Sequence, residues 1–306
     1  SFVTFSINKV WLDKLGLKVP KTFDEYYNVL KAFKEKDPNG NGVQDEIGLD
    51  WAPERGLFCG ISFIGAYGNY TQDFSGDWLT VKDGKFIFLA ETEDYKNLIS
   101  YLHKLYSEGL INQEVFTQDY SQMQARSKDP NYATVGSTLG WDIDDRFGPQ
   151  WFDQYVIMEP LAAQEGIKPL WPAHPMRVKT LSNTNHVTTT NPDLVSTMKW
   201  LDYFYTEEMS AQGYYGSIGV TMDKVDDKYV LREPPEGTSA GEFKWQNALV
   251  DAGMMYVPKS LEDKIIDLPV NLTRVEHDKV YVPYFPDDSN ILPILKFTSE
   301  EASELS

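Results

Sequence analysis

The chain contains little cysteine, little histidine and few cationic residues. Its 306 residues include a single cysteine, Cys59, so an intrachain disulfide is impossible. Lysine and arginine total 28 against 46 aspartate and glutamate residues, which gives a formal net charge of -18. This balance disfavours nucleic-acid binding, because phosphate neutralisation requires clustered cations, and it disfavours an anionic membrane face. The four histidines are scattered, which disfavours a catalytic zinc site.

Long apolar segments are also absent, since no run approaches the roughly 18 residues of a membrane-spanning helix. The composition, with 42% hydrophobic and 14% aromatic residues, is that of a folded protein. The length predicts about two domains or one large one. An acidic surface fits a neutral or cationic small-molecule ligand, and it fits calcium.

Helical and strand patterns alternate along the chain. Thr22 and Glu25 form a capping-box pattern at the start of a predicted helix over residues 22–36. Further helices are predicted over 92–108, from Asn191 and Pro192 to about 205, and over 207–215, with strands at 85–88, 156–158 and 178–181. The alternation predicts an α/β fold. Residues 228–306 are expected to be irregular apart from a helix near 243–252.

The segment after the first of these helices has the spacing of a calcium loop. Oxygen-bearing side chains occupy its first, third, fifth, ninth and tenth positions, and the seventh residue would offer its backbone carbonyl. The predicted ligands are Asp37, Asn39, Asn41, Val43, Asp45 and Glu46. Gly42, at the sixth position, is expected to take a positive φ. The alternative is a polar Asn-Gly turn without metal.

This loop departs from an EF-hand in two respects. The twelfth position is Gly48 instead of a bidentate glutamate, and the residues that follow do not predict an exit helix. Glu46 would therefore have to complete the coordination. These differences predict that calcium would act as a fixed structural brace instead of a signalling site.

Several stretches together resemble the extracellular solute-binding proteins of bacterial ABC importers, in the branch that includes the alginate-binding and lipoprotein-type oligosaccharide binders. The resemblance rests on a run from Asn8 to Glu25, followed by the calcium loop, and on residues 101–111, 200–208 and 215–220. It implies a periplasmic-binding-protein-like α/β fold of type II. Because such proteins have two lobes and exceed 306 residues, we expect residues 1–306 to form a single large lobe, mostly the second. Residues 228–306 would cross back toward the other lobe.

The resemblance also implies a function and a setting. The protein would capture an extracellular oligosaccharide by lobe closure and present it to membrane permease subunits. It would be a monomeric, non-enzymatic protein in the periplasm or on a cell surface, where a lipid anchor outside this chain would hold it. Calcium is the implied cofactor. A peptide or amino-sugar ligand is an open alternative, because an acidic cleft can also hold a cation.

Sugars are bound by aromatic faces and by planar polar side chains, so the tryptophans in predicted loops are candidates. The candidate ligand contacts are Trp141, Asp142, Asp144, Trp51, Trp171 and Arg177. For each loop tryptophan the alternative is packing beneath the loop. By contrast, Trp11, Trp200 and Trp245 are predicted to lie in the core.

Two other functional classes compete with solute binding. Asp142, Asp144 and Asp145 invite a glycoside-hydrolase interpretation, although hydrolases usually take their two carboxylates from separate elements. No phosphate-binding loop or serine nucleophile elbow accompanies them. A calcium-dependent adhesion or scaffold module would carry repeated calcium loops, and the sequence has one.

Overall fold

The computed structural model describes residues 4–51, 60–69, 79–82, 84–171, 186–249 and 254–287. The chain divides into two compact units. Unit 1 comprises residues 1–146, 153–175 and 277–306, and unit 2 comprises 147–152 and 176–276. Within the described ranges, no helix combines the length and the apolar character that crossing a membrane requires.

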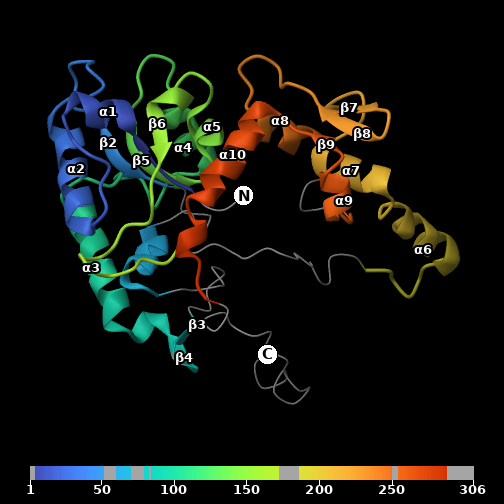
Figure 1. The fold of residues 1–306 in the computed structure, drawn as a ribbon, viewed down its shortest axis with the longest axis horizontal. Helices are drawn as coiled ribbons and strands as arrows, with labels where there is room; N and C mark the ends of the chain where they lie inside the picture. Colours follow the sequence, from blue (N-terminus) through green and yellow to red (C-terminus); the bar gives the residue numbers. More distant parts are fainter. Residues whose placement is uncertain are drawn as a thin grey trace. The chain divides into compact units, whose positions relative to one another are not determined.

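Unit 1 is built on a four-stranded sheet with the order β2-β5-β1-β6 (Figure 1). Its strands are β1 (Thr4–Asn8), β2 (Ile47–Asp50), β5 (Val135–Gly140) and β6 (Tyr155–Ile157). The central strand β1 is buried along its whole length and runs antiparallel to β5 and β6, whereas β2 and β5 are parallel. Because β2 and β5 point the same way, Asp50 and Gly140 end their strands at one edge of the sheet.

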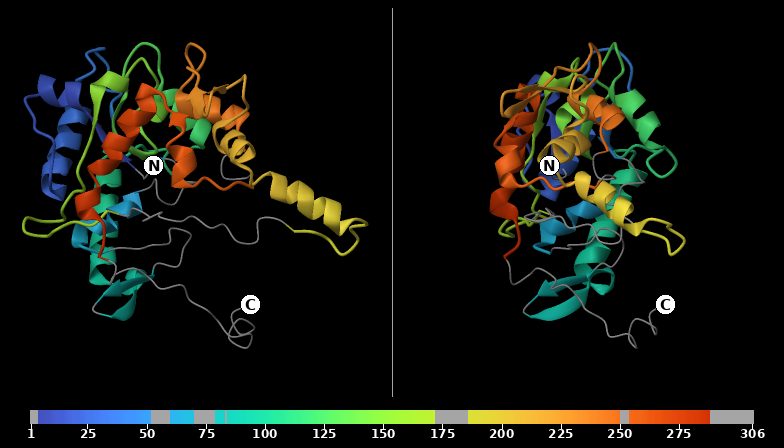
Figure 2. Two further views of the ribbon diagram at one scale, coloured as in Figure 1. Left: turned by 45° about the vertical axis from the view of Figure 1, so that its right-hand side comes forward. Right: turned by 90° about the vertical axis from the view of Figure 1, so that its right-hand side faces the viewer.

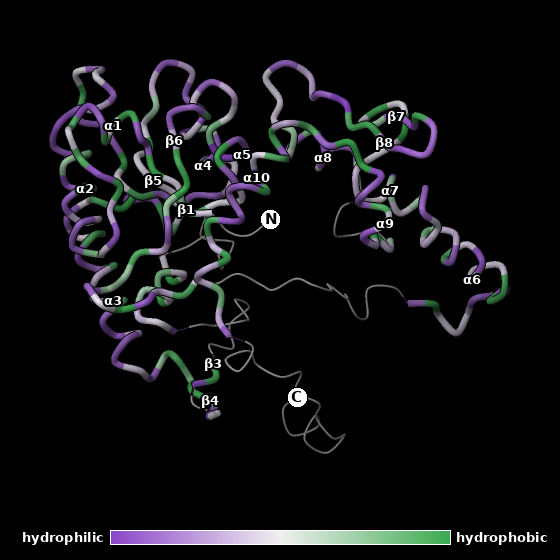
Figure 3. Tube along the Cα trace, in the orientation of Figure 1, coloured by the Kyte–Doolittle hydropathy of each residue, from purple (hydrophilic) through white to green (hydrophobic). Residues whose placement is uncertain are grey.

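Helices and short 3₁₀ segments surround this sheet. They are α1 (Lys9–Lys14), α2 (Phe23–Glu35), η2 (Gly60–Tyr67), η3 (Leu89–Glu91), α3 (Glu93–Ser107), α4 (Tyr120–Ser127), α5 (Ile143–Phe147), η4 (Phe152–Gln154) and η6 (Val282–Tyr284). A separate hairpin of β3 (Leu79–Lys82) and β4 (Lys85–Phe88) precedes α3 (Figure 2). Figure 3 shows the hydrophobic residues concentrated along β5 and β6, with hydrophilic residues in the loops beyond them.

Helix α2 forms where the sequence predicts it. Thr22 accepts a hydrogen bond from the Glu25 backbone N–H at 3.3 Å, while the Glu25 carboxylate accepts from the N–H of Lys21 at 2.7 Å. The buried face of α2 packs on the sheet, where Phe33 lies so close to Gly136 of β5 that a Cβ there would be 2.4 Å from its ring. A glycine at 136 is therefore what lets the helix approach the strand.

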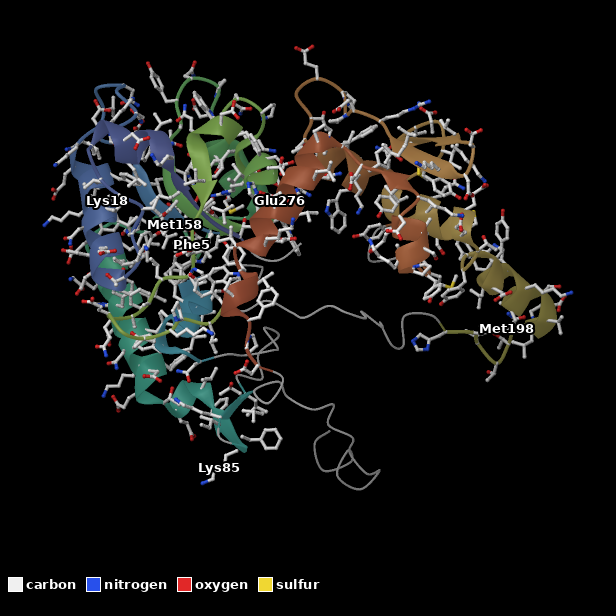
Figure 4. All side chains as sticks on the ribbon, in the orientation of Figure 1. Phe5, Lys18, Lys85, Met158, Met198 and Glu276 are labelled. Carbon is white, nitrogen blue, oxygen red and sulfur yellow. The ribbon has the colours of Figure 1, made fainter. Side chains whose placement is uncertain are left out.

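Aromatic residues dominate the interior of unit 1. Trp171 is 1% exposed, and its ring stacks on Tyr281 with centroids 4.7 Å apart. The backbone oxygen of Phe5 accepts a hydrogen bond from the N–H of Met158 at 2.7 Å, and Figure 4 labels both residues in the interior of this unit. The Tyr281 hydroxyl accepts from the Phe5 N–H at 2.7 Å, which ties the segment after residue 277 to the central strand.

Unit 2 contains α6 (Leu194–Tyr203), α7 (Glu207–Tyr215), α8 (Ala240–Asn247), α9 (Lys259–Glu262) and a small sheet of β7 (Met222–Val225), β8 (Lys228–Leu231) and β9 (Ile265–Ile266). A small cluster of Ala211, Met222, Tyr229 and Leu261 forms its core. Helix α10 (Pro269–Lys279) passes from unit 2 into unit 1.

Three sequence-based predictions need correction. The expectation of one large lobe does not anticipate the division into two units, because helical and strand periodicities do not reveal which elements share a core. The described residues after 228, which are 228–249 and 254–287, are more regular than expected, since they include β8, α8 and α10. Helix α10 was not predicted, because Val270, Thr273 and Val275 are β-branched and lower the helical propensity of this segment. The third helix begins after Asp193, whose carboxylate accepts from the N–H of Ser196, and not at Pro192.

Two of the tryptophans predicted to be buried are exposed in this structure. Trp11 is 1% exposed, as predicted, but Trp200 and Trp245 are 59% and 58% exposed. Helical periodicity marks an apolar face without saying what covers it. The strand predicted at 178–181 lies outside the described residues.

We expect Trp171→Ala to destabilise unit 1 by about 3–5 kcal/mol, because it removes a fully buried indole from a stacked cluster. Urea unfolding followed by circular dichroism measures this. Tyr132→Ala, which truncates a 44% exposed aromatic residue, is the control and should change stability by about 0.5 kcal/mol or less. A loss below about 1 kcal/mol for Trp171→Ala would contradict the assigned packing role.

Candidate functional site

The edge at which β2 and β5 end is organised around Asp50, which is fully buried. Its Oδ1 accepts hydrogen bonds from Asn112 Nδ2 at 2.9 Å and Gln118 Nε2 at 2.7 Å. Its Oδ2 accepts from Arg146 Nη2 at 2.9 Å. Thr138 Oγ1, on β5, donates to the Asp50 backbone oxygen at 2.7 Å. Asp50 thus links β2 to β5 through its backbone oxygen, and to α5 and the segment between α3 and α4 through its carboxylate.

Arg146, the partner of Asp50 on α5, is also buried, with 2% of its surface exposed. Burial lowers the pKa of the Arg146 guanidinium, and the adjacent carboxylate of Asp50 opposes that shift. A buried pair of this kind fixes geometry, because removing either partner leaves the other charge uncompensated. The pair therefore sets the position of α5 against the end of β2.

A small pocket lies beside this buried pair. It is lined by Tyr120, Met123, Leu139, Gly140, Trp141, Asp145 and Arg146. Trp141 is the first residue after β5, and its half-buried side chain supplies an aromatic wall. In open α/β sheets, ligands characteristically bind beyond the carboxyl ends of parallel strands, which is where this pocket lies.

The polar groups of the pocket are held by hydrogen bonds. Tyr120 donates its hydroxyl hydrogen to Asp145 Oδ2 at 2.8 Å, and Gln124 Nε2 donates to the Tyr120 hydroxyl at 2.9 Å. Burial, followed by the charge of Asp145, raises the pKa of Tyr120, so the phenol stays protonated at neutral pH. The arrangement offers an aromatic surface and a fixed carboxylate, and no nucleophile with an adjacent base lies among the lining residues.

The other predicted ligand contacts have different surroundings. Asp142 is 3% exposed; its Oδ1 accepts from the Ile143 N–H at 2.6 Å and lies 2.8 Å from His277 Nδ1. Asp144 is 6% exposed. The Asp142 carboxylate therefore braces the start of α5, and neither Asp142 nor Asp144 lines the pocket.

Trp51 and Trp171 are packed inside unit 1, with exposures of 5% and 1%. The backbone N–H of Trp51 donates to Asp50 Oδ1 at 3.0 Å, and its carbonyl accepts from Gln118 Nε2 at 2.8 Å. The prediction of ligand contact for these two indoles is corrected here, because core packing leaves no face for a sugar. Arg177 lies outside the described residues.

Of the predicted contacts that the structure describes, Trp141 alone lines the pocket. Sequence reasoning missed Tyr120 and Met123, which α4 brings to the site over a separation of about 20 residues. It noted Asp145 only as part of an acidic cluster. No local signal identifies these residues, because their role depends on how α4 packs beside the end of β5.

The predicted calcium loop is compactly folded after α2. Gly42 has a φ of 81°, as the spacing predicted. The Asp37 carboxylate accepts hydrogen bonds from the backbone N–H groups of Gly40, Asn41 and Gly42 at 2.9–3.1 Å. Asn39 and Asn41 direct their Nδ2 groups at the Asp45 carboxylate, at 3.0–3.1 Å.

Among the described residues, no three histidine, cysteine, aspartate or glutamate side chains gather as a metal site. The predicted set also draws on the amide oxygens of Asn39 and Asn41 and on the carbonyl of Val43, whose side chain is 57% exposed. The side chains of Asn39, Asn41 and Asp45 are brought together, whereas Asp37 is occupied by backbone N–H groups.

The surroundings of the Glu46 carboxylate indicate whether this loop could hold a cation. The residue is 7% exposed, its Oε1 accepts from the Asn39 N–H at 3.4 Å, and its buried Oε2 has no hydrogen-bond partner. Desolvation raises the pKa of Glu46, and the neighbouring charges of Asp37 and Asp45 raise it further. A buried acceptor among like charges fits a site for a positive ion, because a cation would compensate both costs.

Comparison with known proteins relates the chain to one group. No family model matches it. It is 30% identical, over 314 aligned positions, to the fructooligosaccharide ABC transporter substrate-binding protein FusA of Streptococcus pneumoniae, with 98% of this chain and 55% of that protein covered. The structure of FusA in complex with kestose matches with a TM-score of 0.82 and 26% identity, covering 99% of this chain and 61% of that one. An EF-hand mutant of FusA in complex with fructo-nystose matches equally well.

The chain is homologous to ABC-transporter substrate-binding proteins. Two relatives from Bacillus subtilis match over shorter regions. Lipoprotein LipO is 38% identical over 115 residues, and the polygalacturonan/rhamnogalacturonan-binding protein YtcQ is 39% identical over 119 residues. They cover 36% and 39% of this chain and 21% and 22% of those proteins. The chain spans about half the length of FusA. The comparisons confirm the α/β solute-binding-protein fold that the sequence predicted.

Proposed function

We propose that this chain belongs to the substrate-capturing component of an ABC importer and takes part in binding an extracellular oligosaccharide. The observation that carries the proposal is the pocket at the end of β5, where Trp141 and Tyr120 supply aromatic surface beside the Asp145 carboxylate. Aromatic rings bind the C–H faces of sugars, and a carboxylate accepts from their hydroxyl groups. The homology to FusA supports the same conclusion.

Capture would proceed by movement of two lobes around the ligand, with binding energy stabilising the closed state. The closed protein would then be presented to membrane permease subunits. We place the protein outside the cytoplasmic membrane, as a monomer, either held by a lipid or in a periplasm. Its relationship to lipoprotein LipO supports the lipid-held form.

We favour binding over hydrolysis because the three aspartates near Trp141 are not arranged as an acid and base pair. Asp142 and Asp144 are buried, and Asp145 is held by the Tyr120 hydroxyl. A glycosidase places its two carboxylates on either side of the scissile bond, about 5–9.5 Å apart, with access to the ligand.

We also propose that the loop from Asp37 to Glu46 holds calcium as a structural brace. Asp37, Asn39, Asn41, Asp45 and Glu46 would supply side-chain oxygens, and Val43 its carbonyl. Calcium prefers such hard oxygen donors. The buried, unpartnered Glu46 Oε2 supports this assignment.

Substitution of Trp141 tests the binding site. We expect Trp141→Ala to weaken oligosaccharide binding about tenfold or more, because the aromatic wall of the pocket is lost. Screening the protein against a panel of glycans, followed by calorimetry with the best ligand, measures the change. Phe116→Ala, which truncates a 70% exposed aromatic, is the control and should leave affinity unchanged. Equal affinity of Trp141→Ala and the wild type, or release of reducing sugar by the wild type, would contradict the proposal.

Substitution of Glu46 tests the calcium assignment, because its effect on the melting temperature should have opposite signs in chelator and in excess calcium. In chelator, the folded state raises the pKa of Glu46 above its unfolded-state value and so favours the protonated acid. The folded protein therefore loses stability as pH rises from the unfolded-state pKa through the folded-state pKa. Glu46→Gln should therefore raise the melting temperature in chelator at neutral pH. In excess calcium the order should reverse, because the wild type gains about 2.7 kcal/mol at 100 times Kd, more than the variant gains.

The control for this experiment is Glu165→Gln, which changes an exposed glutamate elsewhere in unit 1. It should behave as the wild type in both conditions. A wild-type melting temperature that is the same in calcium and in chelator would rule out the brace.

A further inference from the structure

We propose that the pocket beside Trp141 accepts glycans without acidic groups and rejects glycans that carry carboxylates. This inference rests on the proposed function, because it specifies the class of oligosaccharide that the same pocket takes. It concerns the charge of the ligand, which the shape and the aromatic surface of the pocket do not determine. The ionisable groups that line and surround the pocket support this selectivity.

Asp145 is the acidic residue among the lining residues. It is half-buried, and both of its hydrogen-bond partners are uncharged: the Tyr120 hydroxyl at 2.8 Å and Gln124 Nε2 at 3.5 Å. These two partners hold the carboxylate in place without neutralising it. Both engage Oδ2, so Asp145 is oriented to accept hydrogen bonds from further donors.

The cation of the pocket is committed to the protein interior. Arg146 lines the pocket but is 2% exposed, and its Nη2 donates to the buried Oδ2 of Asp50 at 2.9 Å. Turning this guanidinium toward a ligand would leave the Asp50 carboxylate buried without its countercharge. Arg146 is therefore not positioned to pair with a carboxylate on a sugar.

The guanidinium of Arg126 also has acidic neighbours. Arg126, on α4, donates hydrogen bonds to Glu114 and Gln118, and its Nη1 lies 3.8 Å from Asp50 Oδ2. Both guanidinium groups are thus paired with Asp50 or Glu114, which leaves Asp145 as an excess negative charge among these described residues. Of these carboxylates, Asp145 is the one that lines the pocket.

A ligand group that enters this small pocket would lie beside Asp145. Sugar hydroxyls donate hydrogen bonds to a carboxylate, and such charge-assisted bonds are stronger than neutral ones. A carboxylate on a uronic acid would instead place a second negative charge beside Asp145, and like charges within about 4–6 Å disfavour each other's ionised form. The same pocket therefore favours hydroxyl-bearing sugars and opposes acidic ones.

Paired ligands that differ only in charge provide the test. Calorimetry would compare oligogalacturonides with their fully methyl-esterified forms, in which the charge is removed and the sugar framework kept, alongside neutral kestose and nystose. The expected result is binding within the uncharged set, with the free acids at least about tenfold weaker than their esters. Raising the salt concentration should narrow the difference, because screening weakens repulsion.

Asp145→Asn isolates the charge. It should reduce the penalty on the free acids severalfold or more, and it should also weaken neutral ligands, because a neutral amide oxygen replaces a charge-assisted acceptor. Asp153→Asn is the control: Asp153 is exposed and precedes β6, whose Tyr155 pairs with Asn8 at the opposite end of β1 from Gly140. It should behave as the wild type.

The outcomes separate this inference from the function on which it rests. Binding of free acids as tightly as of their esters by the wild type would overturn charge selection while leaving oligosaccharide capture intact. An Asp145→Asn variant that discriminates as strongly as the wild type would also overturn it. Failure of every glycan, charged or neutral, to bind would overturn the proposed function and this inference with it.

Discussion

The carboxylate of Asp50 is the point on which the pocket depends. It is fully buried at the end of β2, and it is reached by Asn112 and Gln118 on one oxygen and by Arg146 on the other. Because these partners come from two different parts of unit 1, the segment between α3 and α4 and helix α5, neither part can move without leaving a buried polar group unpaired. The positions of α4 and α5, and so of the residues that line the pocket, follow from this constraint.

The same constraint gives the pocket its charge. Asp50 holds Arg146 in the interior, which leaves Asp145 as the charged side chain that a ligand would meet among the described residues lining the pocket. A salt bridge that fixes structure thus also determines what the neighbouring pocket can bind. The proposed calcium loop differs in this respect, because its oxygens come from one continuous segment and brace the chain between α2 and β2.

Local signals in the sequence predicted the features that lie within one segment. The helix after Thr22, the helix after Thr92, the positive φ of Gly42 and the α/β class all depend on residues close together along the chain. Features that depend on distant contacts were missed. Tyr120 joins the pocket because α4 packs beside β5, and Trp171 is buried among rings that are distant in sequence, Phe5 and Tyr281.

Hydrogen–deuterium exchange of Asp50→Asn tests the central claim most directly. Loss of the charge should speed exchange in α4 (Tyr120–Ser127), in α5 (Ile143–Phe147) and around Asn112, while α2 exchanges as in the wild type. Asp153→Asn provides the matched comparison. If exchange in α4 and α5 is unchanged, or rises no more than in α2, Asp50 does not hold the pocket in place and the account is wrong.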